Sequence, residues 1–217
     1  MRSQETQQLI SKLVADLKPV PVISRTIVRG AWWLFFSGVT VSLSLYFLGG
    51  PRPDITYVWK YSQFLLDVAF LLLATITATL VAFRLSVPDT KVRYSNKILL
   101  FISTGSWIFL CLKCFLASDI SSHIEDTFTL KPMHCLADLA LMSLPALSIF
   151  FLMLTKSAST HIWWTGYAAA LASTSIAALG ARSLCSLDFE THLLIWHFLP
   201  IGLYALVGAA LTRICLK

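Results

Sequence analysis

The chain has 217 residues, of which 57% are hydrophobic and only 13% carry a charged side chain. Soluble domains usually carry about 25% charged residues, so this composition excludes an ordinary soluble domain and is typical of a multi-pass membrane protein. The net charge of +6 does not predict direct binding to nucleic acid, because the basic residues lie in short connections beside apolar segments.

Residues 1–29 form a polar tail before the first apolar segment. One face of a short amphipathic helix is predicted by the spacing of Leu9, Ile10, Leu13, Val14 and Leu17. Pro19 and Pro21 end this helix. A helix of about 15 residues is too short to span a bilayer. It therefore either lies on the membrane surface or docks in the groove of a partner, and the residues alone do not choose.

Six nearly charge-free segments follow the tail, at residues 30–50, 68–83, 98–112, 139–155, 162–181 and 193–212. Each reaches the length of about 20 residues that a bilayer core requires once a few flanking residues are included. The runs are continuously apolar rather than alternating, which favours helices over a barrel. The sequence predicts an all-α membrane protein in which residues 30–217 form a domain of six transmembrane helices.

The distribution of lysine and arginine predicts the orientation of these helices. The tail, the connection at 84–97, Lys156 and the C-terminus hold twelve of these cations, whereas the other three connections hold four. Short cytoplasmic loops are enriched in such cations. We therefore expect both termini in the cytoplasm, and the loops at 51–62, 118–132 and 183–191 on the outside.

Ionisable groups within the apolar segments gather near the outward ends of the predicted helices. Asp67, Lys113 and Asp138 fall in this layer. Charges inside a membrane usually face a partner or a cavity. Lys113 is predicted to pair with Asp67 or Asp138, and the pair either fixes helix packing or contributes to function.

Cysteine and histidine side chains fall in the same layer. Cys135 and Cys185 are expected at matching depth in different elements, with His134, His192 and His197 nearby. Three interpretations remain open: the thiols form a disulfide, they bind a soft metal together with histidines, or they are small apolar side chains at helix ends. The spacing matches no short zinc motif, so no metal ligand set is assigned.

Cys111 and Cys114 form a C-x-x-C pair inside a predicted membrane helix. This spacing occurs in thiol–disulfide oxidoreductases, and together with Cys135 and Cys185 it supplies the four thiols that a membrane relay requires. A membrane thiol–disulfide oxidoreductase is therefore the alternative function. Two unrelated buried thiols in an apolar helix are the simpler explanation of the pair, since apolar burial raises a thiol pKa and makes it inert.

Several stretches, in order along the chain, resemble the NrsF-type membrane anti-sigma factors. They are "LVADLKPVPVISR" in the tail, "GGPRPDI" after the first apolar segment, "AFRLSVPD" after the second, "LPAL" following Cys135, and "WH" following Cys185. The final "RICLK" departs from the Leu-Arg-Trp ending of that family, and Cys111 and Cys114 are not part of its pattern.

The resemblance implies a bacterial inner-membrane protein, without catalytic activity or cofactor, that restrains an extracytoplasmic-function sigma factor and releases it on envelope stress. It assigns sigma binding to the tail, which covers the apolar stripe and the adjoining Lys18, Pro19 and Val20. It makes Cys135 and Cys185 a pair of outward cysteines. We hypothesise that this pair receives the signal, with His134 and His197 lowering a thiol pKa or completing a metal site.

Overall fold

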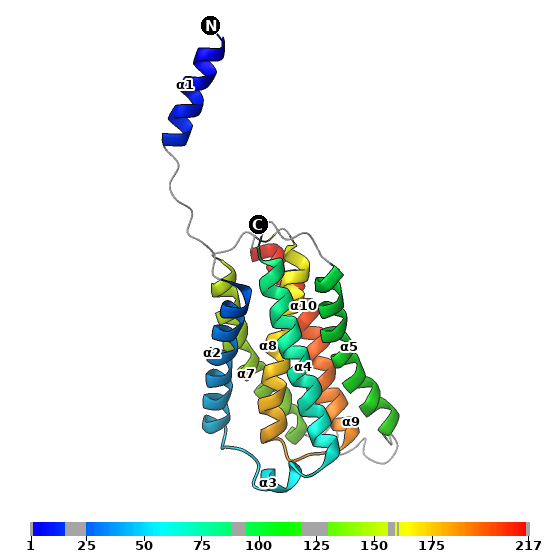
Figure 1. Cartoon of the computed structure of the whole chain (residues 1–217). Coiled ribbons are helices and arrows are strands. Elements are labelled where there is room, and N and C mark those ends of the chain that lie inside the picture. The colour runs from blue at the N-terminus through cyan, green and yellow to red at the C-terminus, as the bar shows by residue number, and fades with distance from the viewer. Residues whose placement is uncertain are drawn as a thin grey trace.

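The computed structural model describes residues 2–15, 25–87, 94–118, 130–155, 159 and 161–215, and every regular element within these ranges is a helix (Figure 1). The long helices are α2 (Thr26–Phe47), α4 (Ser62–Leu85), α5 (Tyr94–Ala117), α7 (Leu130–Leu154), α8 (Ile162–Leu184) and α10 (Leu199–Cys215). The shorter elements are α1 (Arg2–Ala15), α3 (Ile55–Val58), α9 (Glu190–His192) and the π-helical stretch η1 (Leu193–Phe198).

The six long helices lie side by side and alternate in direction, so the start of α2 and the end of α10 lie at the same end of the bundle (Figure 1). This end is called the tail end below, because the N-terminal tail joins it. The opposite end carries α3, α9 and the turn that contains Cys185, and is called the thiol end.

Five helices of the described chain are long and apolar enough to cross a membrane, which is the pattern of a multi-pass membrane protein. They are α2, α4, α5, the 134–154 part of α7, and the continuous helical run 190–214. The prediction of six spans is therefore not confirmed. The helix outside this set is α8, which is as long as the others but rich in alanine, serine and threonine.

The weaker hydropathy of α8 follows from its position. It contacts α2, α4, α7 and α10 and most of its residues are buried, so few of its side chains face the surroundings of the bundle. Gly166 faces α10, where an added Cβ would lie 2.1 Å from the Thr212 hydroxyl oxygen, and Gly208 faces Ala170 in the same way. Small residues thus allow α8 and α10 to approach closely, as in many membrane helix pairs.

The helix that follows the thiol end begins with a π-helical turn. The Leu199 N–H bonds to the Leu194 carbonyl, five residues earlier, instead of four. Pro200 lies directly after this turn and has no N–H to donate, and its ring disfavours a regular α-helical turn before it. Such wide turns occur often at functional sites.

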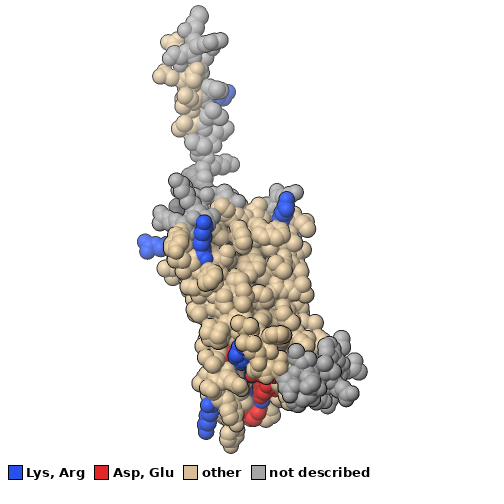
Figure 2. Space-filling view, turned by 90° about the vertical axis from the view of Figure 1, so that its right-hand side faces the viewer, with Lys and Arg blue, Asp and Glu red and all other residues tan. Residues whose placement is uncertain are grey.

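The described surface is divided by charge. The face in Figure 2 carries a broad belt without charged side chains between basic groups near one end and a mixed group of basic and acidic side chains near the other. A belt of this kind is the surface expected of a protein whose middle faces lipid.

The tail forms a helix, as predicted, over Arg2–Ala15. Ile10 and Val14, two members of the apolar stripe, are 54% and 59% exposed. The side chains of Leu9 and Leu13 are not described, and Leu17, Lys18, Pro19 and Val20 lie outside the described residues. The next helix, α2, begins at Thr26, four residues before the predicted domain boundary at residue 30.

Candidate functional site: a thiol–imidazole cluster beside a charge network

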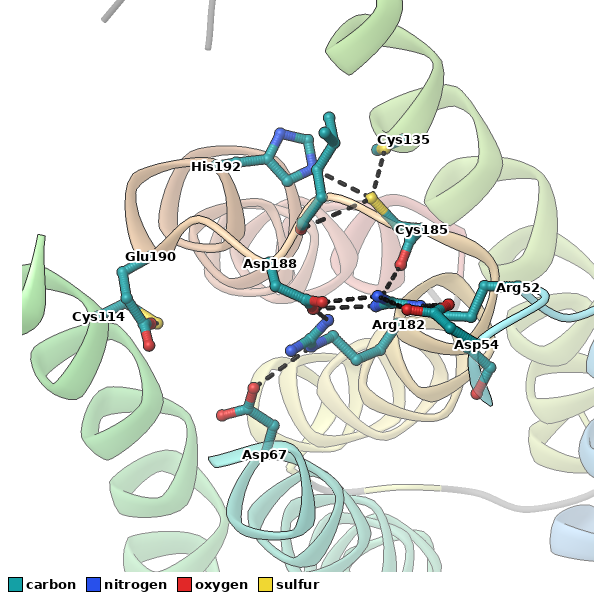
Figure 3. Close-up of polar contacts among 12 residues, drawn as sticks. Arg52, Asp54, Asp67, Cys114, Cys135, Arg182, Cys185, Asp188, Glu190 and His192 are labelled. Carbon is teal, nitrogen blue, oxygen red and sulfur yellow. Dashed lines mark hydrogen bonds and ion pairs between the residues drawn. The ribbon is translucent and has the colours of Figure 1, made fainter. Parts of the chain in front are cut away.

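Two cysteines from different helices meet at the thiol end. Cys135 lies in the second turn of α7, and Cys185 directly follows α8. Their Sγ atoms are 3.4 Å apart, with the Cys135 thiol donating to Cys185, and both are free thiols (Figure 3). The predicted matching depth is therefore confirmed. A disulfide has an S–S distance of about 2.05 Å, so a small movement separates this pair from a covalent bond.

Two buried histidines complete the cluster. His192 Nε2 lies 3.3 Å from Cys185 Sγ, and the rings of His192 and His197 lie 5.3 Å apart. One ligand atom from each of Cys135, Cys185, His192 and His197 lies within 4.8 Å of the others. His192 Nδ1 and both ring nitrogens of His197 are buried without a hydrogen-bond partner among the described residues. We call these four residues the thiol–imidazole cluster.

The π-helical turn explains why the two histidines face the same side. In a regular α-helix of 3.6 residues per turn, residues five apart point about 140° away from each other. A turn with i→i+5 bonds brings such residues nearly over one another. His192 and His197 stand five apart across η1, so the wide turn directs both rings toward Cys185.

The structure corrects two of the predicted positions. His134 is exposed on the first turns of α7 and is not a member of the cluster, where His192 lies instead. Asp138 was predicted as a possible partner of Lys113. Its electrostatic neighbours are His134, Cys185 and His197, so it lies beside the cluster and not in the charge network.

The ligand types of the cluster suit a soft or borderline metal ion. Zinc binds thiolate and imidazole at ~2.0–2.3 Å with tetrahedral geometry, which places ligand atoms ~3.3–3.8 Å apart. The present separations of up to 4.8 Å therefore require only a small contraction of the cluster around an ion. Thiolate ligands also select monovalent copper and related soft ions.

A charge network lies directly beside the cluster and begins at Arg52. This side chain is buried and donates to both carboxylate oxygens of Asp54 and of Asp188, at 2.6–3.0 Å (Figure 3). It also donates to the Cys185 carbonyl at 2.9 Å, while its backbone N–H bonds to the Ser183 carbonyl. One guanidinium thus joins the loop after α2 to the turn that carries a cluster thiol.

The network continues into the bundle. Arg182 of α8 contacts Asp188 and lies 3.3 Å from Asp67 of α4, which is fully buried. Lys113 of α5 lies 2.7 Å from Asp67 and 3.7 Å from Glu190. The predicted pairing of Lys113 with Asp67 is therefore confirmed, and the network ties α4, α5, α8 and the start of α9 together.

Charge and hydrogen bonding shift the pKa values of the groups in the turn. Hydrogen bonds donated to its sulfur by Cys135 and His192 lower the pKa of the Cys185 thiol, although burial opposes this. Burial raises the pKa of Asp188, but the hydrogen bonds from Arg52 and Arg182 outweigh it and hold the pKa below its usual value. Hydrogen bonds to Asp54 and Asp188 raise the pKa of Arg52.

The C-x-x-C pair occupies a different place. Cys114 is buried and donates its thiol hydrogen to Glu190 at 2.9 Å, and Cys111 is half-buried on the same helix. Both are free thiols. Cys114 thus packs against the charge network, and the described contacts do not join it to Cys135 or Cys185.

Comparison with known proteins gives one finding. A protein-family model with the description "Negative regulator of sigma F", named NrsF, matches residues 13–217. No curated protein and no solved structure matches the chain. The match covers the whole helical bundle, including all four cluster residues and the charge network, and the family description implies a regulatory and not a catalytic role. The chain belongs to the NrsF family, the negative regulators of sigma F.

Proposed function

We propose that this protein is a multi-pass anti-sigma factor of the bacterial inner membrane. It holds an extracytoplasmic-function sigma factor at the tail end of the bundle and releases it when the thiol–imidazole cluster receives an envelope signal. All six long helices cross the bilayer, α8 as the enclosed central one, and both termini lie in the cytoplasm. Family membership and the excess of lysine and arginine near the tail end support this arrangement.

The tail is the sigma-binding element in this proposal. Ile10 and Val14 lie exposed on an amphipathic helix, and the family description names a sigma factor as the regulated partner. A short amphipathic helix commonly binds by laying its apolar face into a groove of the partner. A sigma factor held at the membrane in this way cannot reach RNA polymerase and promoters.

One observation carries the assignment of the sensor: two free thiols and two imidazoles, with three ring nitrogens that have no hydrogen-bond partner among the described residues, meet in one cluster at the end opposite the tail. Burying a polar nitrogen without a hydrogen bond costs free energy. Leaving several such nitrogens beside two thiols is expected if the cluster receives a ligand. A thiol-seeking metal cation is therefore the signal that this geometry favours.

Metal binding would change the packing at the thiol end. Coordination replaces the two thiol hydrogens and releases two protons, and it draws Cys135 of α7 toward the turn after α8 and the start of the last helix. The tail lies about 30 Å away, across the bilayer core. The signal therefore requires two helix packings that the bound and free clusters stabilise differently.

Oxidation is a second signal that the same pair can receive. The loss of two protons and two electrons from Cys135 and Cys185 to an oxidant such as hydrogen peroxide yields a disulfide and two molecules of water. The Sγ–Sγ distance of 3.4 Å favours this reaction. It leaves the unpartnered nitrogens of His192 and His197 without a role, so metal binding explains more of the cluster.

The alternative of a thiol–disulfide oxidoreductase has less support. A relay needs exchange between Cys111 or Cys114 and the outer pair, whereas Cys114 is engaged with Glu190. The family assignment also describes a regulator.

Co-purification and metal titration test the proposal together. The full chain, expressed with the sigma factor encoded next to it, is expected to retain that protein on an affinity column. Addition of one equivalent of cadmium should produce the thiolate-to-metal absorption band and elute the sigma factor. His197→Gln should weaken cadmium binding, whereas His134→Gln, outside the cluster, should not.

Three results would contradict the proposal. A chain that does not retain the sigma factor is not its anti-sigma factor. A chain that binds cadmium without releasing the sigma factor does not use the cluster as a sensor. Equal cadmium affinity in the His197→Gln and wild-type proteins would show that the imidazoles are not ligands.

A further inference from the structure

A groove at the tail end of the bundle lies far from the thiol–imidazole cluster. Its volume is about 800 Å³, within the range of ligand pockets. It is formed by the end of α4, the first turns of α5 and α8, and the later part of α10. Its lining includes Lys97, Phe101, Thr104, Trp163, Trp164 and Leu206, and no acidic residue is among the described side chains that line it.

Most of the groove wall is apolar. Leu100, Phe101 and Leu206 line it, and Phe101 and Leu206 are 78% and 58% exposed, while the buried Asn96 is a polar member of the lining. Two hydroxyl groups in the lining, those of Thr104 and Tyr167, bond to each other at 3.2 Å. The remaining surface therefore suits hydrocarbon rather than a polar ligand.

The mouth of the groove favours a negative charge. Lys97 and His161 lie there, together with the first turns of α5 and α8. The start of a helix carries a partial positive charge, and His161, the N-cap residue of α8, makes no side-chain capping bond to the first N–H groups of this helix. Trp163 and Trp164, which line the same mouth, are residues typical of the membrane interface.

We propose that this groove binds an anionic phospholipid, with an acyl chain along the apolar wall and the phosphate at Lys97. Lys97 and Thr104 are seven residues apart, so the groove extends for roughly 10 Å along α5. Figure 2 shows a belt without charged side chains around the middle of one face of the bundle, which is the surface expected where lipid contacts a protein. Basic pockets between membrane helices commonly bind such headgroups.

The length of the groove favours an acyl chain over the tail helix. A helix of 14 residues, such as α1, is roughly 21 Å long, about twice the stretch of α5 that lines the groove. An acyl chain is thinner, and it is present at this depth in any bilayer. The phospholipid does not depend on the sigma factor or on a metal, so this proposal stands or fails separately from the proposed function.

Photo-crosslinking identifies the occupant directly. A benzoylphenylalanine residue at Phe101, in the full chain within native membranes, should add the mass of a phospholipid after irradiation. An adduct with the tail of the same chain, with a second copy or with another protein would overturn the proposal.

Native mass spectrometry tests the charge preference. The delipidated full chain, offered phosphatidylglycerol and phosphatidylethanolamine with identical acyl chains, should retain the anionic lipid at least fivefold more. Lys97→Gln should reduce this ratio to about one. Arg213 is an exposed cation on the last turn of α10 outside the groove, so Arg213→Gln should preserve the ratio. Leu206→Trp should reduce the binding of both lipids by filling the groove.

Equal retention of the two lipids by the wild-type protein would overturn the proposal. An unchanged ratio in Lys97→Gln would do the same, because the phosphate would then not be held at Lys97. Unchanged binding in Leu206→Trp would place the acyl chain elsewhere on the protein.

Discussion

Lys113 Nζ lies 2.7 Å from Asp67 Oδ1, so a cation on α5 and a fully buried carboxylate on α4 form an ion pair inside the bundle. Arg182 contacts the other oxygen of the same carboxylate from α8. Asp67 therefore has two cationic partners. Loss of one cation leaves the Asp67 carboxylate with the other as counter-charge, whereas loss of both leaves the carboxylate without any counter-charge.

This arrangement predicts a strongly non-additive pair of mutations. Lys113→Leu or Arg182→Leu alone should lower the free energy of unfolding modestly, since the other cation still compensates Asp67. In the double variant the free energy of unfolding should fall by about 0.5–3 kcal/mol more than the sum of the two single losses. An unpaired buried charge costs about 3–5 kcal/mol. Unfolding of the purified protein in mild detergent measures this.

The matched control removes the charge that the cations compensate. Adding Asp67→Asn to the double variant should restore a large part of the lost free energy of unfolding. Lys60→Leu, which removes an exposed cation at the same end of the bundle, should have little effect. Simple additivity of Lys113→Leu and Arg182→Leu would show that the two cations do not share Asp67.

Arg52 is predicted to hold the turn that carries Cys185. It bonds to the Cys185 carbonyl and to both oxygens of Asp188. Arg52→Gln should therefore free the turn and speed maleimide labelling of Cys185 several-fold in a variant whose other cysteines are replaced by serine. The labelling rate of Arg52→Lys should be close to that of Arg52→Gln, because lysine cannot make the paired planar contacts of arginine. A labelling rate equal to that of wild type would show that the turn is held by other contacts.

The pKa of Asp188 predicts a loss of stability in acid. Its pKa in the folded protein is lowered from the ordinary aspartate value of 3.8 by the hydrogen bonds from Arg52 and Arg182, so the carboxylate contributes stability at any pH above about 4. This contribution is lost as the pH falls below 3.8 through the lower folded-state pKa. The melting temperature of wild type should therefore fall between pH 5 and pH 3 more than that of Asp188→Asn. Parallel curves for the two proteins would contradict the assignment.

The tail predicts a contrast between two faces of one helix. Ile10→Asp or Val14→Asp should abolish retention of the sigma factor, because burying an aliphatic side chain contributes ~1.5–3 kcal/mol and a buried unpaired carboxylate adds a penalty. Lys12 lies off the apolar stripe, so Lys12→Ala should reduce retention of the sigma factor only slightly. The fraction of sigma factor that co-purifies measures this. Equal losses in both classes would show that the stripe is not the contact surface.

Much of the fold was predictable from the sequence. The apolar runs predicted the long helices because continuous apolar character is visible along the chain without tertiary information. The sequence did not predict that the helix over residues 162–181 is less apolar than the other long helices because it is enclosed by them. Its alanine, serine and glycine content reflects enclosure by four neighbouring helices, which no local pattern records.

The site was predictable in part. Helix direction alone placed Cys135 and Cys185 at one depth, and the structure brings them together. The sequence did not identify His192 as a partner of His197, because residues five apart lie on different faces of a regular α-helix. Only the π-helical turn places the two rings on the same side. Pro200 was the available signal for that turn.

The charge network was the larger omission. Asp67 and Lys113 were identified because charges stand out in apolar segments. Arg52, Arg182 and Asp188 lie at segment ends, where charge is ordinary, so their pairing across the bundle became visible only in three dimensions.

The central claim is that Cys135 and Cys185 act as one unit that controls release of the sigma factor. A sigma-dependent reporter in cells, challenged with cadmium and separately with hydrogen peroxide, tests it most directly. Wild type should respond, and Cys135→Ser and Cys185→Ser should each lock the reporter in the same single state. The reporter response of the double variant should equal that of either single variant, since the effects of mutations within one unit are not additive. Cys111→Ser and Cys114→Ser should respond as wild type does. A full wild-type response in both Cys135→Ser and Cys185→Ser would show that the pair is structural and that the signal enters elsewhere.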